Sequence, residues 1–119
     1  MTTTKVLYID DDFQNGTLMK RVLEADGYDV SLAANGVSGL TQASSERHDL
    51  ILLDVNMPDL SGYEVARSLR QMYNTRHIPI LLISATFNSK EEYLQVGCDG
   101  FISKPIDVDH ISEQIAAYL

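Results

Sequence analysis

The chain has 119 residues, of which 45% are hydrophobic and 22% charged, and this length and composition predict one globular domain over residues 1–119. Seventeen acidic residues against nine lysines and arginines give a net charge of −8, so we expect no direct binding to nucleic acid or to an anionic membrane surface. Because no stretch reaches the roughly 20 apolar residues of a membrane span, and "MTTTK" lacks the layout of a secretory signal, we expect a cytoplasmic protein.

Five apolar runs along the chain predict β-strands. They are "KVLYID" (Lys5–Asp10), "YDVSLA" (Tyr28–Ala33), "DLILLD" (Asp49–Asp54), "PILLIS" (Pro79–Ser84) and "GFIS" (Gly100–Ser103). The first, third and fourth runs are apolar on both faces, as in a parallel sheet that helices cover on each side. The second run alternates more, which places it nearer an edge of the sheet.

Helical patterns fill the segments between these strands. The first lies in "FQNGTLMKRVLEADGY", where Gly27 is a natural stop and the residues at helical spacing are Leu18, Met19, Val22 and Leu23. The second lies in "GVSGLTQASSERH", where one face carries Val37, Leu40 and Ala43. Capping boxes at Ser61–Glu64 and Ser89–Glu92 predict the next two helix starts. Asp107 is the predicted cap of the last helix, whose inward stripe is Val108, Ile111, Ile115 and Leu119.

Strands and helices therefore alternate five times, which predicts a five-stranded parallel sheet that is doubly wound, with helices on both faces. Residues with other metal-binding or redox chemistry are few. Cys98 is the only cysteine, so neither an internal disulfide nor a zinc cluster of cysteines can form, and we interpret it as a packing residue. His48, His77 and His110 lie far apart without ligand spacing, and we expect them at surface or boundary positions.

Polar or charged residues close four of the five predicted strands. In chain order they are Asp10, Asp11 and Asp12, then Asp54, then Ser84, then Lys104 with Pro105. Sites in a doubly wound sheet gather outside the carboxyl ends of the strands, so these side chains are expected to meet. Converging carboxylates raise one another's pKa values unless a cation lies among them, and Mg²⁺ is the hard ion that best suits carboxylates and a backbone carbonyl.

A pocket with one metal and one lysine suits phosphoryl transfer, in which positioning and charge neutralisation carry most of the catalysis. Asp54 would be the nucleophile, because carboxylates form aspartyl-phosphate intermediates. Taken singly, the same residues have plainer interpretations, since acids after a strand often cap the next helix and a lone aspartate often forms a turn.

The fragments "YIDDD", "LLDVNMPDLSG", "ISA" and "FISKP", in this order and spacing, resemble the receiver domain of two-component response regulators over Lys5–Leu119. The resemblance implies a flavodoxin-like (βα)5 fold with strand order 2-1-3-4-5. It also implies a phosphorelay module that takes a phosphoryl group from a histidine kinase or a histidine phosphotransfer protein and signals to a downstream protein target. Such a module acts only on itself, by self-phosphorylation and autodephosphorylation, so we expect no enzyme with external turnover.

The resemblance also implies a role for each residue of the pocket. Asp54 would be the phosphoacceptor and a metal ligand, and Asp11 would bind Mg²⁺ directly. Asp10 would reach the metal through water, and the backbone carbonyl of Asn56 would add a further contact. The groups that would hold the phosphoryl oxygens are Lys104, the Ser84 hydroxyl and the Ala85 amide. Asp12 is assigned no metal bond, because capping the first helix explains it.

Ser84 and Phe101 would form the switch, with the hydroxyl drawn to the phosphoryl group and the aromatic ring rotating inward. Ser84 stands where the family often has threonine, and Phe101 where tyrosine is also common. The bond between Lys104 and Pro105 would be cis. The phosphodonor would dock at the start of the first helix, with candidates Phe13, Asn15, Gly16 and Met19. The face that changes would be the fourth helix, fifth strand and fifth helix, including Lys90, Tyr93, Ser103 and His110.

Three other functions compete with this one. A Mg²⁺-dependent phosphatase of the haloacid dehalogenase type would use Asp10 as nucleophile and Asp12 as the second acid, but it leaves Asp54 unexplained and the chain has no room for a cap domain. A flavodoxin-like electron carrier would need a first loop rich in hydroxyls and glycine to hold a phosphate. A receiver-like module that is never phosphorylated is disfavoured by the complete set of acids, serine and lysine.

Overall fold

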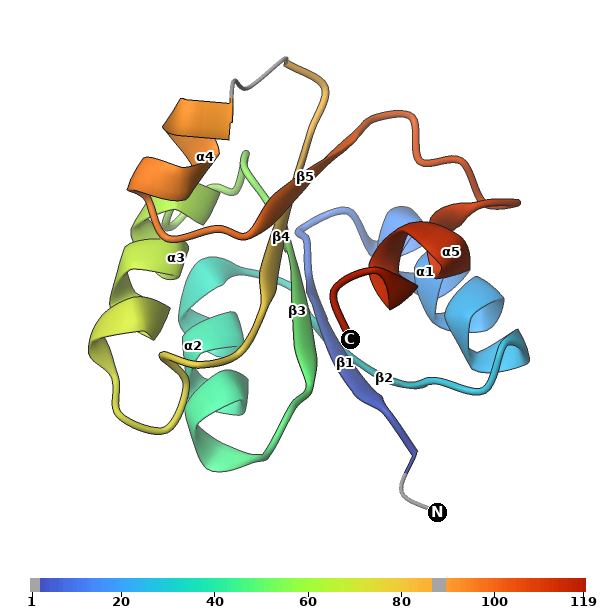
Figure 1. Ribbon diagram of the computed structural model, residues 1–119, viewed down its shortest axis with the longest axis horizontal. Coiled ribbons are helices and arrows are strands. Elements are labelled where there is room, and N and C mark those ends of the chain that lie inside the picture. Colours follow the sequence, from blue (N-terminus) through green and yellow to red (C-terminus); the bar gives the residue numbers. More distant parts are fainter. Residues whose placement is uncertain (1–2, 87–89) are drawn as a thin grey trace.

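The computed structural model describes residues 3–86 and 90–119, in which strands and helices alternate (Figure 1). The strands are β1 (Lys5–Ile9), β2 (Asp29–Ala33), β3 (Leu50–Asp54), β4 (Ile80–Ser84) and β5 (Gly100–Ser103). The helices are α1 (Phe13–Ala25), α2 (Gly36–Ser45), α3 (Gly62–Gln71), α4 (Lys90–Gln95) and α5 (Ile111–Ala116). Each predicted strand is confirmed to within one residue at its ends. Within the described ranges, no helix has the length and apolarity needed to cross a membrane.

All five strands are parallel and follow the order β2-β1-β3-β4-β5, as the family resemblance implied. Helices α2, α3 and α4 cover one face of the sheet, and α1 and α5 cover the other (Figure 1). β3 and β4 are buried along their whole length because both of their faces are covered. The carboxyl ends of the strands therefore gather at one edge of the molecule.

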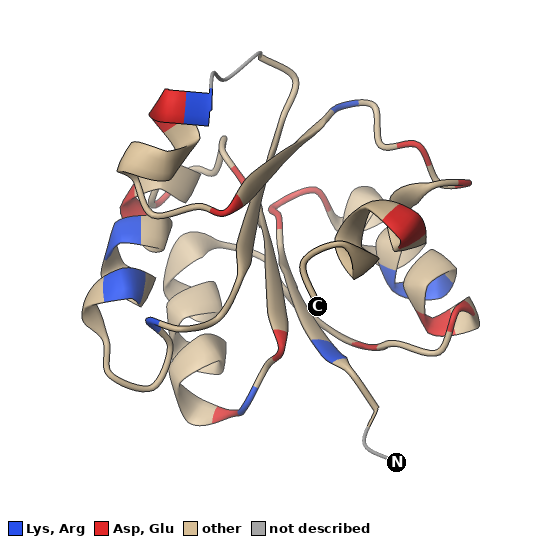
Figure 2. Cartoon of the chain, in the orientation of Figure 1, with Lys and Arg blue, Asp and Glu red and all other residues tan. Residues whose placement is uncertain are grey.

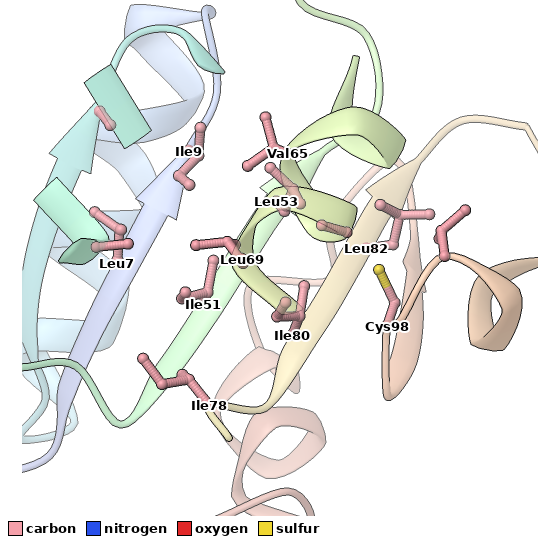
Figure 3. Packing of buried hydrophobic residues seen from close by; sticks show 14 of the residues in the cluster. Leu7, Ile9, Ile51, Leu53, Val65, Leu69, Ile78, Ile80, Leu82 and Cys98 are labelled. Carbon is pink, nitrogen blue, oxygen red and sulfur yellow. The ribbon is translucent and has the colours of Figure 1, made fainter. Parts of the chain in front are cut away.

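Alternate residues of the strands supply two separate hydrophobic cores. The core beneath α2, α3 and α4 contains Leu7, Ile9, Ile51, Leu53, Val65, Leu69, Ile78, Ile80, Leu82 and Cys98 (Figure 3). The side chain of Cys98 is 1% exposed, which confirms it as a packing residue, and burial raises the pKa of its thiol to about 12. The core beneath α1 and α5 contains Val6, Tyr8, Met19, Leu23, Leu52, Leu81, Ile83, Ile111 and Ile115, among others.

The buried face of α2 differs from the predicted one. Val37 is 58% exposed, and the helix instead packs through Gly36, Gly39 and Ala43. A Cβ at Gly39 would lie 2.6 Å from the Cδ1 atom of Ile9, so the glycine lets the helix backbone approach β1 closely. The predicted apolar stripe was wrong at Val37 because the helix contacts β1 through Gly39, which has no side chain and so does not appear in a pattern of apolar residues. In α1, Leu18 belongs to the predicted apolar pattern but is 43% exposed, whereas Met19 and Leu23 are buried.

Helix ends are confirmed where the capping contact is local. Ser61 and Glu64 form the predicted capping box, with the two contacts at 3.2 and 3.1 Å. The prediction for Asp107 was wrong: its carboxylate accepts from the Asp109 amide at 3.1 Å and caps a turn, and α5 begins only at Ile111. Of the predicted stripe of α5, only Ile111 and Ile115 are buried. The capping box predicted at Ser89–Glu92 starts outside the described residues.

His48 contradicts the expectation of a surface or boundary position, since it is only 3% exposed, whereas His77 and His110 are exposed. Neither ring nitrogen of His48 has a hydrogen-bond partner among the residues that the structure describes. The ring lines a cavity of about 310 Å³ with Asn74 and Ile78, where the loop before β3 meets the loop before β4. No local sequence pattern indicates this burial, because two loops from separate segments enclose the side chain.

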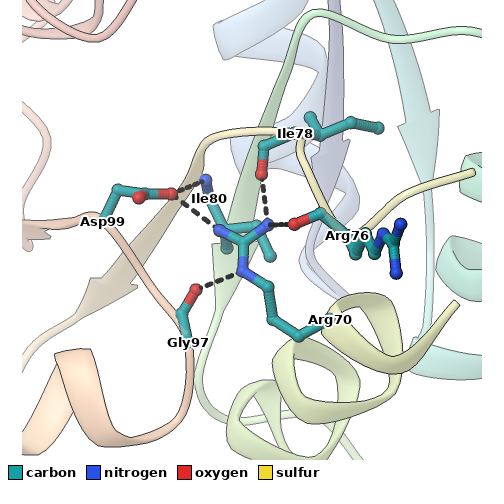
Figure 4. A network of polar contacts seen from close by, with 6 residues as sticks. All are labelled: Arg70, Arg76, Ile78, Ile80, Gly97 and Asp99. Atoms are coloured by element: carbon teal, nitrogen blue, oxygen red, sulfur yellow. Dashed lines mark hydrogen bonds and ion pairs between the residues drawn. The ribbon is translucent and has the colours of Figure 1, made fainter. Parts of the chain in front are cut away.

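Arg70 ties three segments together at the amino edge of the sheet (Figure 4). Its guanidinium donates to the backbone carbonyls of Gly97 at 2.7 Å and Ile78 at 2.6 Å, and it pairs with Asp99 at 2.7 Å. Asp99 also accepts the amide of Ile80 at 2.8 Å, at the first residue of β4. The end of α3, the start of β4 and the turn before β5 are therefore held as one unit.

We expect His48 to make the protein less stable in acid. Burial lowers the pKa of His48 below its usual 6.5, against the raising effects of Glu46 and Asp49 and with a smaller lowering effect of Lys5. As the pH falls below 6.5, the unfolded chain therefore binds a proton that the folded chain resists, and the free energy of unfolding decreases. The variant His48→Gln should lose less stability than the wild type between about pH 7.5 and about pH 5.5, measured by urea unfolding. The control His77→Gln should behave as the wild type, and equal losses in all three proteins would contradict the prediction.

The variant Arg70→Lys should lower the free energy of unfolding by about 2 kcal/mol, because an ammonium cannot replace the planar donor fork that serves three backbone carbonyls and a carboxylate. The control Arg67→Lys changes an exposed arginine on the same helix and should stay within about 0.5 kcal/mol of the wild type. Chemical denaturation of the three proteins measures both effects. Equal stability of the two variants would show that the network contributes nothing measurable.

Candidate active site

Three carboxylates meet at the carboxyl edge of the sheet. One oxygen each of Asp10, Asp11 and Asp54 lies within 4.8 Å of the others. The strand register brings Asp10 and Asp54 together, because Ile9 of β1 pairs with Leu53 of β3 and each of these two residues is followed by an aspartate. The loop after β1, with its consecutive aspartates, is red in Figure 2. Asp10 and Asp54 are only 5% and 2% exposed, whereas Asp11 faces solvent.

Lys104 supplies the positive charge of this pocket. Its Nζ atom lies 2.6 Å from the Oδ1 atom of Asp54. The residue directly follows β5, and its backbone amide donates to the carbonyl of Ser84 at 2.9 Å, so the end of β4 positions it. The peptide bond from Lys104 to Pro105 is cis, as the family resemblance implied.

The electrostatic balance of the pocket is unfavourable without a cation. Burial raises the pKa of Asp54; the hydrogen bond from Lys104 opposes this rise, and the charges of Asp10 and Asp11 add to it. Burial also works to lower the pKa of Lys104, but the hydrogen bond and charge of Asp54 outweigh it, so the net pKa of Lys104 is raised. Three carboxylates against one ammonium leave an excess of two negative charges, which one divalent cation would balance.

The donor set fits Mg²⁺. This ion binds oxygen at about 2.1 Å in an octahedron, so two ligands on opposite sides of it lie roughly 4.2 Å apart. One carboxylate oxygen each of Asp10, Asp11 and Asp54 lies within 4.8 Å of the others, a spacing close to the one that two ligands of a single Mg²⁺ ion need. A third carboxylate can act through a bound water, since Mg²⁺ usually keeps several waters. Asn56 is exposed, two residues beyond Asp54, and the metal contact of its carbonyl stays a prediction.

Two contacts fasten the loop that follows Asp54. The amide of Gly62, at the start of α3, donates to the carbonyl of Val55 at 2.8 Å. A Cβ at Gly62 would lie 2.5 Å from the carbonyl oxygen of Asp54, so only glycine allows this approach. Farther along the loop, Asp59 accepts from the amides of Gly36 and Val37, each at 2.9 Å. The loop is thereby joined to α2 as well as to α3.

The residues predicted to form the switch and to hold the phosphoryl group come from the end of β4 and from β5, next to the strand end that carries Lys104. Ser84 ends β4, is 2% exposed, and its hydroxyl accepts the amide of Thr86 at 3.0 Å. Ala85 is exposed and lines a cavity of about 420 Å³ together with Lys104, Asn15 and residues of α1. Phe101 is half-buried in β5, paired with Leu82, and packs against the core beneath α2, α3 and α4.

Tyr8 and Asp59 are site residues that the sequence analysis missed. The Tyr8 hydroxyl donates to the Oδ2 atom of Asp10 at 2.9 Å, and the Oδ1 atom of Asp10 accepts the Asp12 amide at 2.9 Å. Asp12 itself caps α1 by accepting from the amides of residues 14 and 15, which confirms its predicted role. A tyrosine in an otherwise aliphatic strand, two residues before an acid on the same face, is the signal that could have identified Tyr8. Asp59 gave no local signal beyond a turn-forming residue.

Comparisons with known proteins agree with one another. The family model of the response regulator receiver domain matches residues 6–116. The polar-differentiation response regulator DivK of Brucella anthropi is 37% identical over 116 residues, which are 96% of this chain and 94% of DivK. The structure of the Vibrio cholerae chemotaxis protein CheY4 superposes with a TM-score of 0.94 at 30% identity, covering 99% of this chain and 100% of CheY4. The receiver domain of the Pseudomonas aeruginosa sensor histidine kinase PA1611, with a magnesium ion coordinated in its active-site cleft, has a TM-score of 0.88 at 28% identity over 98% of both chains.

The close contact at Gly62 yields a prediction for the site. The variant Gly62→Ala places a methyl group 2.5 Å from the Asp54 carbonyl oxygen, so either α3 or the end of β3 must shift, and the free energy of unfolding should fall by about 2 kcal/mol. The control Gly16→Ala adds a methyl group with ordinary contact to Leu32 at 3.5 Å inside a helix, and it should keep or raise stability, by up to about 1 kcal/mol. Urea unfolding compares the variants, and a Gly62→Ala protein as stable as Gly16→Ala would refute the close-approach argument.

Proposed function

The chain belongs to the response regulator receiver domain family, and from this premise we propose that Asp54 accepts a phosphoryl group from a histidine kinase or a histidine phosphotransfer protein in a Mg²⁺-dependent reaction. The observation that carries the proposal is the meeting of the Asp10, Asp11 and Asp54 oxygens within 4.8 Å, with Lys104 at 2.6 Å from Asp54. A buried carboxylate with a lysine and two further acids beside it is equipped for charge-neutralised attack rather than for packing alone.

In this reaction a carboxylate oxygen of Asp54 forms a bond to phosphorus while the bond from phosphorus to the imidazole nitrogen of the donor's phosphohistidine breaks. Mg²⁺, when bound, neutralises charge between the carboxylates and the phosphoryl oxygens. Asp11 and Asp54 would hold it directly, Asp10 would hold it through water, and the Asn56 carbonyl would complete the set. The magnesium ion in the cleft of the PA1611 receiver supports this assignment. Lys104 would then pair with a phosphoryl oxygen instead of with the Asp54 carboxylate.

Phosphorylation would act as a switch because it adds close to two negative charges at a buried position. The Ser84 hydroxyl, which accepts the Thr86 amide in this structure, would turn toward the new oxygens, and the Ala85 amide would help to hold them. The loop after β4 would move with Ser84, and the half-buried Phe101 could then rotate inward. The outcome is a shift between two packings of α4, β5 and α5, the face that we assign to a downstream protein target.

The phosphodonor would dock beside the site, at the start of α1. Phe13 is 80% exposed and Leu18 is 43% exposed on this helix. The cavity of about 420 Å³ between α1 and the segment after β5 lies next to Lys104. Of the candidates predicted for docking, Phe13 and Asn15 stay in the proposal. Gly16 and Met19 are buried in the helix interface and are therefore removed from it.

The competing phosphatase function finds less support in the geometry. It needs Asp10 as nucleophile and Asp12 as an acid, but Asp12 is used as the cap of α1 and both oxygens of Asp10 already accept hydrogen bonds. It also leaves the pairing of Asp54 with Lys104 without a purpose. We therefore favour a receiver that modifies only itself, and hydrolysis of a generic aryl phosphate by the wild type would revive the alternative.

The variant Asp54→Asn should lose phosphoryl uptake completely while it keeps the fold. Incubation with acetyl phosphate and Mg²⁺, followed by intact mass measurement, should show one phosphoryl adduct on the wild type and none on the variant. The control Asp29→Asn changes an exposed aspartate at the opposite edge of the sheet and should keep the adduct. Chelation of the metal should abolish uptake in the wild type. A phosphoryl adduct on Asp54→Asn would overturn the assignment.

A further inference from the structure

Tyr8 links the buried core of the sheet to the acidic pocket. Its side chain is 1% exposed and belongs to the core beneath α1 and α5, where it pairs in register with Leu32 of β2 and Leu52 of β3. Its hydroxyl is buried and donates to the Oδ2 atom of Asp10 at 2.9 Å. The phosphoryl-transfer chemistry proposed above makes no use of Tyr8.

The neighbourhood of the hydroxyl makes this contact specific. The strand residues that share its core are aliphatic: Val6, Val30, Leu50, Leu52, Leu81, Ile83 and Ile102. A buried hydroxyl needs a partner to offset the loss of water, and the partner here is a carboxylate, which makes the hydrogen bond charge-assisted. The ring alone would fill the core equally well, so packing does not account for the hydroxyl.

Asp10 is held by two donors on opposite oxygens. Tyr8 donates to Oδ2, and the Asp12 amide donates to Oδ1 at 2.9 Å. Two such bonds fix the plane of the carboxylate, because rotation about its side-chain bonds would break at least one of them. The fixed carboxylate keeps an oxygen within 4.8 Å of the oxygens of Asp11 and Asp54.

We propose that Tyr8 is a positioning residue for the Mg²⁺ site, which fixes the Asp10 carboxylate in the orientation that binds the metal through water. The inference rests on the proposed function, since it deepens the same site. In this arrangement each buried acid has its own side-chain donor: the Lys104 ammonium donates to Asp54, and the Tyr8 hydroxyl donates to Asp10. Lys104 is released when a phosphoryl group arrives, whereas Tyr8 stays in place on the neighbouring strand.

The variant Tyr8→Phe keeps the ring in the core and removes the hydroxyl alone. Mg²⁺ affinity should then fall about tenfold, the lower end of the range for hydrogen bonds that orient metal ligands. A titration with MgCl₂ followed by amide ¹H–¹⁵N NMR measures the affinity, and the same spectra report whether the fold is intact. The matched control is Tyr28→Phe, a tyrosine that packs on the same core from the residue before β2, and its affinity should equal that of the wild type.

A second pair of variants tests whether Tyr8 acts through Asp10. The single variant Asp10→Asn is compared with the double variant Asp10→Asn/Tyr8→Phe. Because Asp10→Asn removes one of the repelling carboxylates, the fold should tolerate the loss of the Tyr8 hydroxyl in this background. The two should bind Mg²⁺ equally, and this comparison stands even where Tyr8→Phe alone does not fold.

The outcomes separate the two proposals. A wild type whose spectra do not respond to Mg²⁺ would overturn the metal site and this inference with it. A wild type that binds Mg²⁺, with Tyr8→Phe binding as tightly or more tightly, would overturn the role of Tyr8 alone. An additional loss of affinity in the Asp10→Asn background would equally overturn it, because Tyr8 would then act by another route.

Discussion

The repulsion among three carboxylates in one small pocket is the constraint on which the rest of the structure depends. Asp10 and Asp54 are almost fully buried, and adjacent parallel strands bring them side by side in register. Such a pocket is stable only where its buried acids have donors, and the fold supplies donors to Asp10 and Asp54 from separate segments, while Asp11 faces solvent. Lys104 comes from the end of β5, Tyr8 from the core beneath the site, and the Asp12 amide from the start of α1. The remaining negative charge would favour a divalent cation, and through it a phosphoryl group, as the proposed function requires.

The two edges of the sheet are built in opposite ways. At the amino edge, Arg70 meets backbone carbonyls and Asp99, so the charged groups there are matched and the segments are fixed. At the carboxyl edge, the acids outnumber their cationic partner, and the Ser84 hydroxyl accepts a neighbouring amide, which under the proposed function it would exchange for a phosphoryl oxygen. Rigidity at one edge and electrostatic imbalance at the other suit the proposed switch, because a new charge would then change one end of the molecule without unfolding the other.

Much of this fold could be predicted because its main signals are local or periodic. Strands that are apolar on both faces were located to within one residue, and parallel order then placed Asp10, Asp54 and Lys104 at one edge. The Ser61 capping box was correct for the same reason, since it involves a single turn. The family resemblance added the cis bond before Pro105 and the strand order, which periodicity alone does not determine.

The misses involve contacts between segments that are distant in sequence. His48 is buried by two loops, and Val37 faces outward because Gly39 takes the contact with β1. Asp59 is a further case, with a consequence of its own. Its two carboxylate oxygens accept hydrogen bonds from the amides of Gly36 and Val37, which join the loop after Asp54 to the first turn of α2. When these two hydrogen bonds open, the amide hydrogens of Gly36 and Val37 become accessible to solvent. Their rate of exchange with deuterium therefore reports how often the loop after Asp54 separates from α2.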